Sequence, residues 1–187
     1  MGVIDGIDYG PLAALIGEWE GDKGMDISPE PDGTEENPYF ETISCEAAGD
    51  VTNAESQTLV IVRYHQVVSR KSNGEVFHDQ IGYWLWDAAS GMLAHSIAIP
   101  RAVCVLAGGT LAPDSSGPLV LKVAAKLGDA DWGIVQSPFM RDNARTTAFS
   151  YEGTVDGDSF RYSETTSLEI YGRTFEHTDD SELVRKK

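Results

Sequence analysis

The segment GEWEGDKG, residues 17–24, carries the clearest structural signal in this chain. Its tryptophan, Trp19, stands between Gly17 and Gly21, and Gly24 ends the segment. Glycine lets a strand bend and lets a neighbouring strand approach closely. A large aromatic side chain among such glycines fits a strand whose indole fills one end of a small β-barrel. A tryptophan in the core of a β-sandwich would also fit these eight residues.

The rest of the chain consists largely of short strand-like runs separated by turn residues. The pattern runs from residue 39 onward, and its clearest strands are 57–70, 76–87, 92–99, 102–107, 110–112, 119–126, 145–155, 159–170 and 173–185. No ten-residue helical pattern alternates with these runs, which argues against parallel βαβ units. We therefore predict an all-β protein with a single domain over residues 1–187. Its expected architecture is an antiparallel, up-and-down β-barrel of about ten strands.

Three segments depart from this strand pattern. Residues 9–16 predict a short N-terminal helix, with Pro11 in its first turn. Residues 28–38 are acidic and contain three prolines, which predicts an exposed loop. Residues 128–144 are irregular and predict a loop or short helix that covers one mouth of the barrel.

The composition limits the class of partner. Among 187 residues, 30 are acidic and 14 are Lys or Arg, so the formal net charge is −16. Such a charge repels phosphate backbones and anionic membranes, and we expect neither nucleic acid nor membrane as a partner. No signal-peptide pattern and no long apolar run is present, which predicts a cytoplasmic protein. Cys45 and Cys104 lie far apart in sequence and are expected to be buried free thiols.

Alternation along the strands predicts which side chains point inward. In 158–170 the apolar face carries Phe160, Tyr162, Glu164, Thr166, Leu168 and Ile170. In 173–185 the face with Phe175 and Leu183 also carries His177, so His177 is expected inside the barrel. His78 shares a face with Gln80, Trp84 and Trp86 and is expected in the same interior.

The histidines are the best candidates for chemistry. None of His65, His78, His95 and His177 has a partner at zinc-ligand spacing, and the chain has no Cys-x-x-Cys. No nucleophile elbow, phosphate loop or dinucleotide fingerprint occurs. A lone inward histidine is either a satisfied core residue or the axial ligand of a haem held by apolar walls. His177 is the best candidate for that ligand, and His78 for a distal hydrogen-bond donor.

Three sequence features in this order resemble the nitrobindin-like haem-binding β-barrels, which share their shape with fatty-acid-binding proteins and lipocalins. The features are P-L-x-x-L-x-G-x-W-x-G at 11–21, F-H-D-Q-I-G-Y at 77–83, and one histidine about ten residues before the end. The resemblance covers nearly the whole chain. It implies a ten-stranded barrel with a b-type haem, His177 as the proximal iron ligand, and Phe175 beside it. The distal edge would hold Phe77, His78 and the apolar segment after Pro100. Members bind nitric oxide and are credited with isomerising peroxynitrite to nitrate at ferric haem.

Two other functions fit the same residues. The barrel is alternatively a carrier of an apolar small molecule, in which Arg63 or Arg101 meets a carboxylate group. It is alternatively a metal-free enzyme in which His177 and Asp179 form an acid–base pair. Residues i and i+2 on one strand face lie about 6–7 Å apart, so this pair needs favourable rotamers to form a hydrogen bond. Asp179 and Asp180 follow His177 where haem-binding members tend to have apolar residues.

Overall fold

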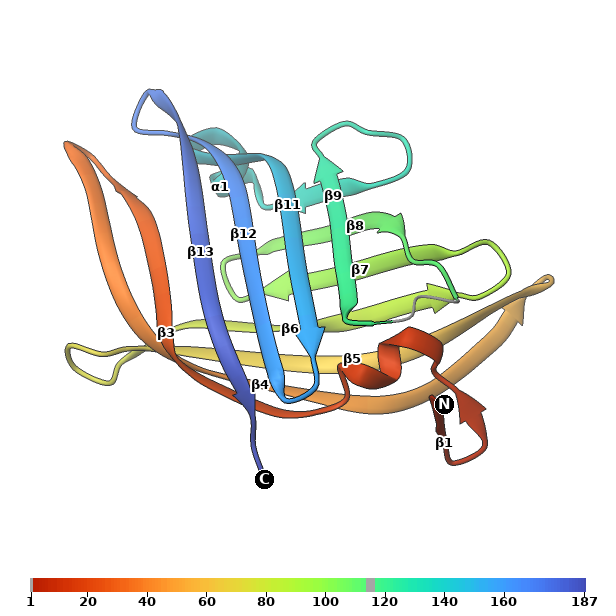
Figure 1. Cartoon of the computed structure of the whole chain (residues 1–187). Helices are drawn as coiled ribbons and strands as arrows, with labels where there is room; N and C mark the ends of the chain where they lie inside the picture. Colours follow the sequence, from red (N-terminus) through yellow and green to blue (C-terminus); the bar gives the residue numbers. More distant parts are fainter. Residues whose placement is uncertain (1, 114–116) are drawn as a thin grey trace.

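The computed structural model describes residues 2–113 and 117–187 and consists mainly of a closed antiparallel β-barrel (Figure 1). The barrel has ten strands, as predicted. They are β3 (Gly17–Glu30), β4 (Gly33–Ala54), β5 (Gln57–Arg70), β6 (Val76–Asp87), β7 (Met92–Ile99), β8 (Val103–Thr110), β9 (Leu119–Lys126), β11 (Ala144–Asp156), β12 (Ser159–Ile170) and β13 (Arg173–Arg185). Neighbours in the sheet are neighbours in sequence, and β13 pairs with β3. The pairing of Gly108 with Ala124 joins β8 to β9 and closes the barrel.

The remaining elements lie outside the ring of strands. A small hairpin, β1 (Val3–Ile4) and β2 (Ile7–Asp8), leads into η1 (Gly10–Ala14). The predicted N-terminal helix is therefore a single 3-10 segment, with Pro11 in its first turn as expected. The predicted irregular segment 128–144 contains strand β10 (Gly133–Gln136), which pairs with β8, and helix α1 (Pro138–Asn143). Of the helices that the described residues form, none is long and apolar enough to span a membrane.

The prediction of a loop over 28–38 is wrong, because this segment is the tip of the β3–β4 hairpin. Pro29 pairs with Thr34 next to the turn. Pro38 precedes the first residue of β4 that pairs with β5, which is Tyr39. Pro38 lies inside β4, opposite Met25, but both prolines stand where the hairpin is paired on one side only. Proline is tolerated there because its missing N–H can face away from the ladder. The error matters for function, since this hairpin contributes residues to the site.

The runs 102–107 and 110–112 do not form two strands, because β8 continues through the glycines to Thr110. Gly108 and Gly109 do not form a turn; each allows a neighbouring group to pack closely against β8. A Cβ at Gly108 would lie 2.0 Å from the Trp132 ring, and one at Gly109 would lie 2.0 Å from the carbonyl oxygen of Lys122 on β9. The close approach at this point lets the barrel close.

Trp19 fills one end of the barrel, as the opening segment predicts. Its side chain is 1% exposed, and its Nε1–H donates to the carbonyl oxygen of Leu15 at 2.8 Å. The Arg185 guanidinium lies 4.1 Å from the centre of the Trp19 ring and donates to the carbonyl oxygens of Ala14 and Ile16. This arrangement ties η1 and the end of β13 across the same opening. We call this the Trp19 end.

Aromatic side chains fill the middle of the barrel. His95 stacks on Trp84 with ring centres 3.7 Å apart, and Tyr151 stacks on Tyr162 at 5.5 Å. Tyr64 and Phe149 are buried beside them. The middle of the barrel is therefore packed, and an interior cavity lies toward the end opposite Trp19.

The cysteine prediction holds in part. Both cysteines are free, and Cys45 is buried. Cys104 is exposed, contrary to expectation, because it stands on β8 between the inward-facing Val103 and Val105.

Candidate functional site

A cavity of about 190 Å³ lies between the aromatic core and the turns at 31–32, 71–75 and 171–172. We call this side of the barrel the hairpin end. Most of the side chains around the cavity are polar or charged. They include Asp26, Gln66, Arg70, His78, Gln80, Glu164, His177 and Asp179, with Val68 and Phe77 as apolar members.

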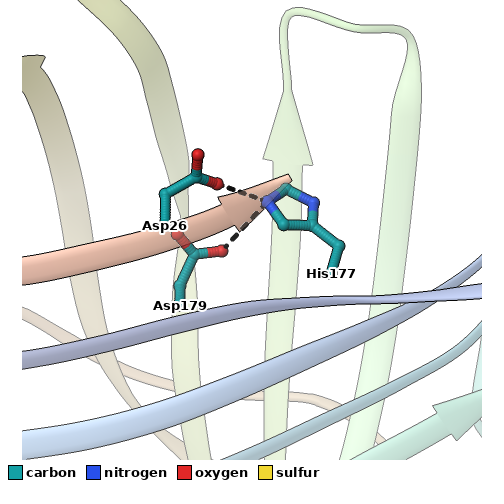
Figure 2. A group of neighbouring side chains, drawn as sticks. All are labelled: Asp26, His177 and Asp179. Atoms are coloured by element: carbon teal, nitrogen blue, oxygen red, sulfur yellow. Dashed lines mark hydrogen bonds and ion pairs between the residues drawn. The ribbon is translucent and has the colours of Figure 1, made fainter. Parts of the chain in front are cut away.

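His177 stands at the centre of an acidic cluster in this cavity. Its Nε2 lies 2.5 Å from Oδ1 of Asp26 and 3.5 Å from Oδ2 of Asp179. Figure 2 shows both carboxylates directed at this one ring nitrogen. The strand register explains the grouping, because Asp179 on β13 pairs with Asp26 on β3. His177 lies two residues before Asp179 and therefore on the same inward face.

A second layer of polar groups fixes the carboxylate of Asp26. Asn37 pairs with Asp26 across the β3–β4 ladder, and its Nδ2 donates to Oδ2 of Asp26 at 2.8 Å. Arg70 in turn donates to Oδ1 of Asn37. Asp26 is only 3% exposed. Its Oδ2 accepts from Asn37, and its Oδ1 faces His177.

The charges in the cluster shift all three pKa values. Burial alone would raise the pKa of Asp26, but the hydrogen bond and charge of His177, with hydrogen bonds from Asn37 and Ser28, hold it below its ordinary value. Burial, together with the charges of Asp26 and Asp180, raises the pKa of Asp179 to about 7. Burial would lower the pKa of His177, but Asp26 and Asp179 outweigh it and raise it.

Two further carboxyl groups lie close to this cluster. Glu164, on β12, lines the cavity, and burial together with the charges of Asp179 and Glu41 raises its pKa well above the ordinary value. Glu41 lies behind the cavity wall, where its Oε1 accepts from the hydroxyl of Tyr162 and from Nε2 of Gln66, both at 2.6 Å. Its Oε2 has no hydrogen-bond partner within residues 2–113 and 117–187, and burial raises the pKa of Glu41 to about 7. The region therefore holds an excess of carboxyl groups over cations.

His78 faces the same cavity from β6. Its Nε2 lies 3.1 Å from Oε1 of Gln80, whose Nε2 donates to the hydroxyl of Tyr64 at 2.8 Å. Burial lowers the pKa of His78, and the nearby charge of His177 lowers it further. The pKa values of the two histidines around the cavity are thus shifted in opposite directions.

The structure brings some of the predicted site residues together and separates others. His177, His78 and Phe77 all line the cavity. Phe77 and His78 are consecutive on β6 yet both reach it, because the register between β5 and β6 shifts at this point: Val68 pairs with His78 and Ser69 pairs with Val76. Phe175 shares the inward face of β13 but is not among the residues around the cavity. The predicted His177–Asp179 pair is present.

The two arginines proposed for carboxylate binding lie outside the cavity. Arg63 is on the outer face and pairs with Glu46, and Arg101 is exposed in the turn after β7. A larger depression of about 1040 Å³ also lies on the outer face, over β5 to β8 and β10. Sequence reasoning missed Asp26, because no local pattern shows which strand lies beside β13.

Comparisons with known proteins agree with the fold. A family model described as a THAP4-like, heme-binding beta-barrel domain matches residues 8–185. Among solved structures, Rv2717c from M. tuberculosis matches with a TM-score of 0.65 and 19% sequence identity, over 94% of this chain and 95% of that one. A search of curated proteins finds no match.

The residues around His177 do not fit a haem in this structure. A drug-sized ligand occupies a mostly apolar cavity of about 300–1,000 Å³, and haem is a large ligand of this kind. The cavity here measures about 190 Å³, and most of the residues that line it have polar or charged side chains. The nitrogen that would meet an iron, Nε2 of His177, is held between Asp26 and Asp179.

Proposed function

This chain belongs to the family of THAP4-like, heme-binding beta-barrel domains, and on that premise we propose that it is a ligand-binding barrel. We place its site in the cavity around His177. The ligand is small and carries a positive charge or several hydrogen-bond donors. The barrel supplies a rigid frame in which strands β3, β6, β12 and β13 hold the contacting side chains.

One observation carries this proposal, namely the carboxyl groups that surround a small cavity. Asp26, Glu164 and Asp179 face it, while Arg70 is directed at Asn37 and lies over the Phe77 ring at 4.5 Å. Carboxylates accept hydrogen bonds and attract cations, and a partly dehydrated site strengthens both effects. Membership of the family supports haem as a ligand, but the geometry favours a smaller and more polar one.

Methylammonium is a suitable probe of the proposed site. We expect it to shift the imidazole NMR signals of His177 and His78 in isotope-labelled protein. Glu164→Gln replaces a carboxyl group that faces the cavity with an amide and should weaken binding about tenfold. Glu46→Gln, on the outer face, is the matched control and should leave binding unchanged. Absence of any shift at His177 and His78, or an equal effect of both substitutions, would overturn the proposal.

A second candidate function is haem binding, which the family match favours. In this case His177 must leave Asp26 before its Nε2 is free, and Phe77 and His78 would line the ligand. The b-type haem, nitric oxide binding and peroxynitrite isomerisation stay predictions of this candidate. Absorbance spectra with added haemin separate the two candidates.

The expectations about partners and location are those drawn from the sequence. The net charge of −16 argues against nucleic acid and anionic membranes as partners. A single domain over residues 1–187 and a cytoplasmic location remain predictions.

A further inference from the structure

Three side chains in the cavity have the positions and chemistry of metal ligands. Nε2 of His177 and one carboxylate oxygen each from Asp26 and Asp179 lie within 4.8 Å of one another. Atoms that share one divalent ion at about 2.0–2.2 Å are at most about 4.4 Å apart, so binding would require these side chains to close by at most a few tenths of an ångström. The three groups come from two adjacent strands, β3 and β13, and meet on the same side of the barrel wall (Figure 2).

A supporting layer orients the most buried of these ligands. Asn37 donates to one oxygen of Asp26, and Arg70 donates to Asn37. Metal ligands in proteins are commonly held in this way by outer hydrogen bonds that fix the direction of the free lone pair. The oxygen of Asp26 that remains faces His177 and the cavity.

His78 offers a fourth donor from the opposite side of the same cavity. Its Nε2 meets the side-chain oxygen of Gln80 at 3.1 Å, so binding a metal would require the imidazole to give up that contact. The space of about 190 Å³ also leaves room for several waters or a small ligand, since one water occupies about 30 Å³.

The electrostatic balance favours a cation at this place. Two carboxylates approach the same ring nitrogen, and a third carboxyl group, Glu164, faces the cavity. The simplest arrangement without a metal is an imidazolium between two carboxylates. That arrangement leaves the free space of the cavity unused, whereas a divalent ion with its waters would fill it.

We propose that the cavity binds one divalent transition-metal ion of the Zn²⁺ and Mn²⁺ class through His177, Asp26 and Asp179, with His78 as a fourth ligand. Imidazole together with carboxylates suits these ions better than Mg²⁺ or Ca²⁺, which prefer oxygen ligands alone. The proposal rests on the proposed function, because it names the cation that the same cavity takes. For an ion that takes six ligands, such as Mn²⁺, four protein ligands would leave two coordination positions for water or a further ligand in the free space.

Titration of chelator-treated full-length protein with Zn²⁺, Mn²⁺ and Mg²⁺ by calorimetry tests the proposal. We expect one Zn²⁺ per chain, weaker binding of Mn²⁺ and much weaker binding of Mg²⁺. His177→Gln and Asp179→Asn should each weaken Zn²⁺ binding about 100-fold, and Asn37→Ala about tenfold, in the range seen for outer-layer contacts. Because Asp26 is buried, the absorption spectrum of bound Co²⁺ in the unmodified protein provides a readout of coordination that needs no substitution there.

The outer face of the barrel provides a matched control. Nε2 of His65 lies 3.0 Å from Oδ1 of Asp79, an exposed pair with similar geometry but a single carboxylate. His65→Gln should leave the Zn²⁺ affinity unchanged. The proposal is overturned if Zn²⁺ does not bind with a stoichiometry of one, or if His177→Gln and Asp179→Asn, folded by circular dichroism, bind it as tightly as the parent. If methylammonium still shifts the His177 signal in that case, the proposed function stands and only the metal is excluded.

Discussion

At the scale of single residues, two histidines have opposite surroundings. His177 is held between carboxylates, while His95 is 2% exposed and neither of its nitrogens has a hydrogen-bond partner among the residues that the structure describes. The rings around His95 belong to Tyr64, Trp84, Phe149 and Tyr151, and none carries a charge. A buried imidazole without a charged partner must stay neutral in the folded protein.

This environment predicts an acid sensitivity that can be assigned to His95. Burial lowers its pKa to about 3 in the folded state, whereas the unfolded value is 6.5. Below pH 6.5 the unfolded chain therefore binds a proton that the folded protein excludes, and the free energy of unfolding falls. His95→Phe should remove this loss, so its stability relative to the parent should rise by about 1.4 kcal/mol per pH unit from pH 6.5 down toward 3.

Urea unfolding of both proteins between pH 7 and 4 measures the effect. Taking the difference cancels opposite contributions from carboxyl groups such as Glu41, whose pKa of about 7 acts with the reverse sign. Phe149→Leu alters the same aromatic cluster without removing a titrating group, and its difference from the parent should not depend on pH. A His95→Phe difference that is flat with pH would show that the His95 ring is not excluded from protonation.

At the scale of elements, the site depends on how closely β3 approaches its neighbours. Gly24 lies at a shift in the β3–β4 register, and a Cβ there would come within 1.8 Å of the Tyr39 ring. The Tyr39 hydroxyl lies 3.1 Å from that of Tyr162, which borders the cavity. The absence of a side chain at Gly24 therefore lets the Tyr39 ring extend to the hydroxyl of Tyr162 at the cavity wall.

Gly24→Ala should destabilise the protein by about 1–3 kcal/mol, because Tyr39 is forced out of a packed position. Gly33→Ala, in the same hairpin, is the matched control, since nothing lies within 4 Å of its added Cβ. Thermal unfolding of the two variants gives the comparison. Equal melting temperatures would mean that the contact between Gly24 and Tyr39 does not constrain β3.

Much of this element arrangement could be predicted from the sequence. Period-two alternation places His177 and His78 inside, and Trp19 among glycines identifies the filled end. The hairpin at 28–38 was not predicted, because three prolines outweigh weak strand signals when the neighbouring strands are unknown. Asp26 and Asn37 were missed for the same reason, since their place beside Asp179 depends on the pairing of the first barrel strand with the last.

At the scale of the whole molecule, the barrel has two different ends. η1, Trp19 and Arg185 fill one, and the acid–histidine cavity lies at the other, with an aromatic core between them. The family resemblance read from the sequence is confirmed by the family match over residues 8–185. The polar side chains around His177 include Asp26 and Asp179, which stand opposite each other on the paired strands β3 and β13.

The net charge of −16 also acts on the molecule as a whole. With 30 acidic and 14 Lys or Arg side chains, repulsion between carboxylates should outweigh the surface ion pairs. Raising the ionic strength from about 0.01 M to about 0.15 M shortens the screening length from about 30 Å to about 8 Å. We therefore expect the melting temperature to rise by a few degrees (about 2–5 °C).

Sodium chloride and tetramethylammonium chloride should raise the melting temperature equally at the same ionic strength, because screening does not depend on the identity of the cation. A decrease with either salt would mean that ion pairs dominate the surface electrostatics. An effect confined to sodium would point to bound ions rather than screening.

The most direct test of the account is a haemin titration of the metal-free protein, followed by absorbance and repeated with His177→Ala. Nε2 of His177 lies between two carboxylates in a cavity of about 190 Å³. We therefore expect no Soret band that depends on His177, so the two proteins should give the same spectrum. A saturable band at one haemin per chain that disappears in His177→Ala would contradict it.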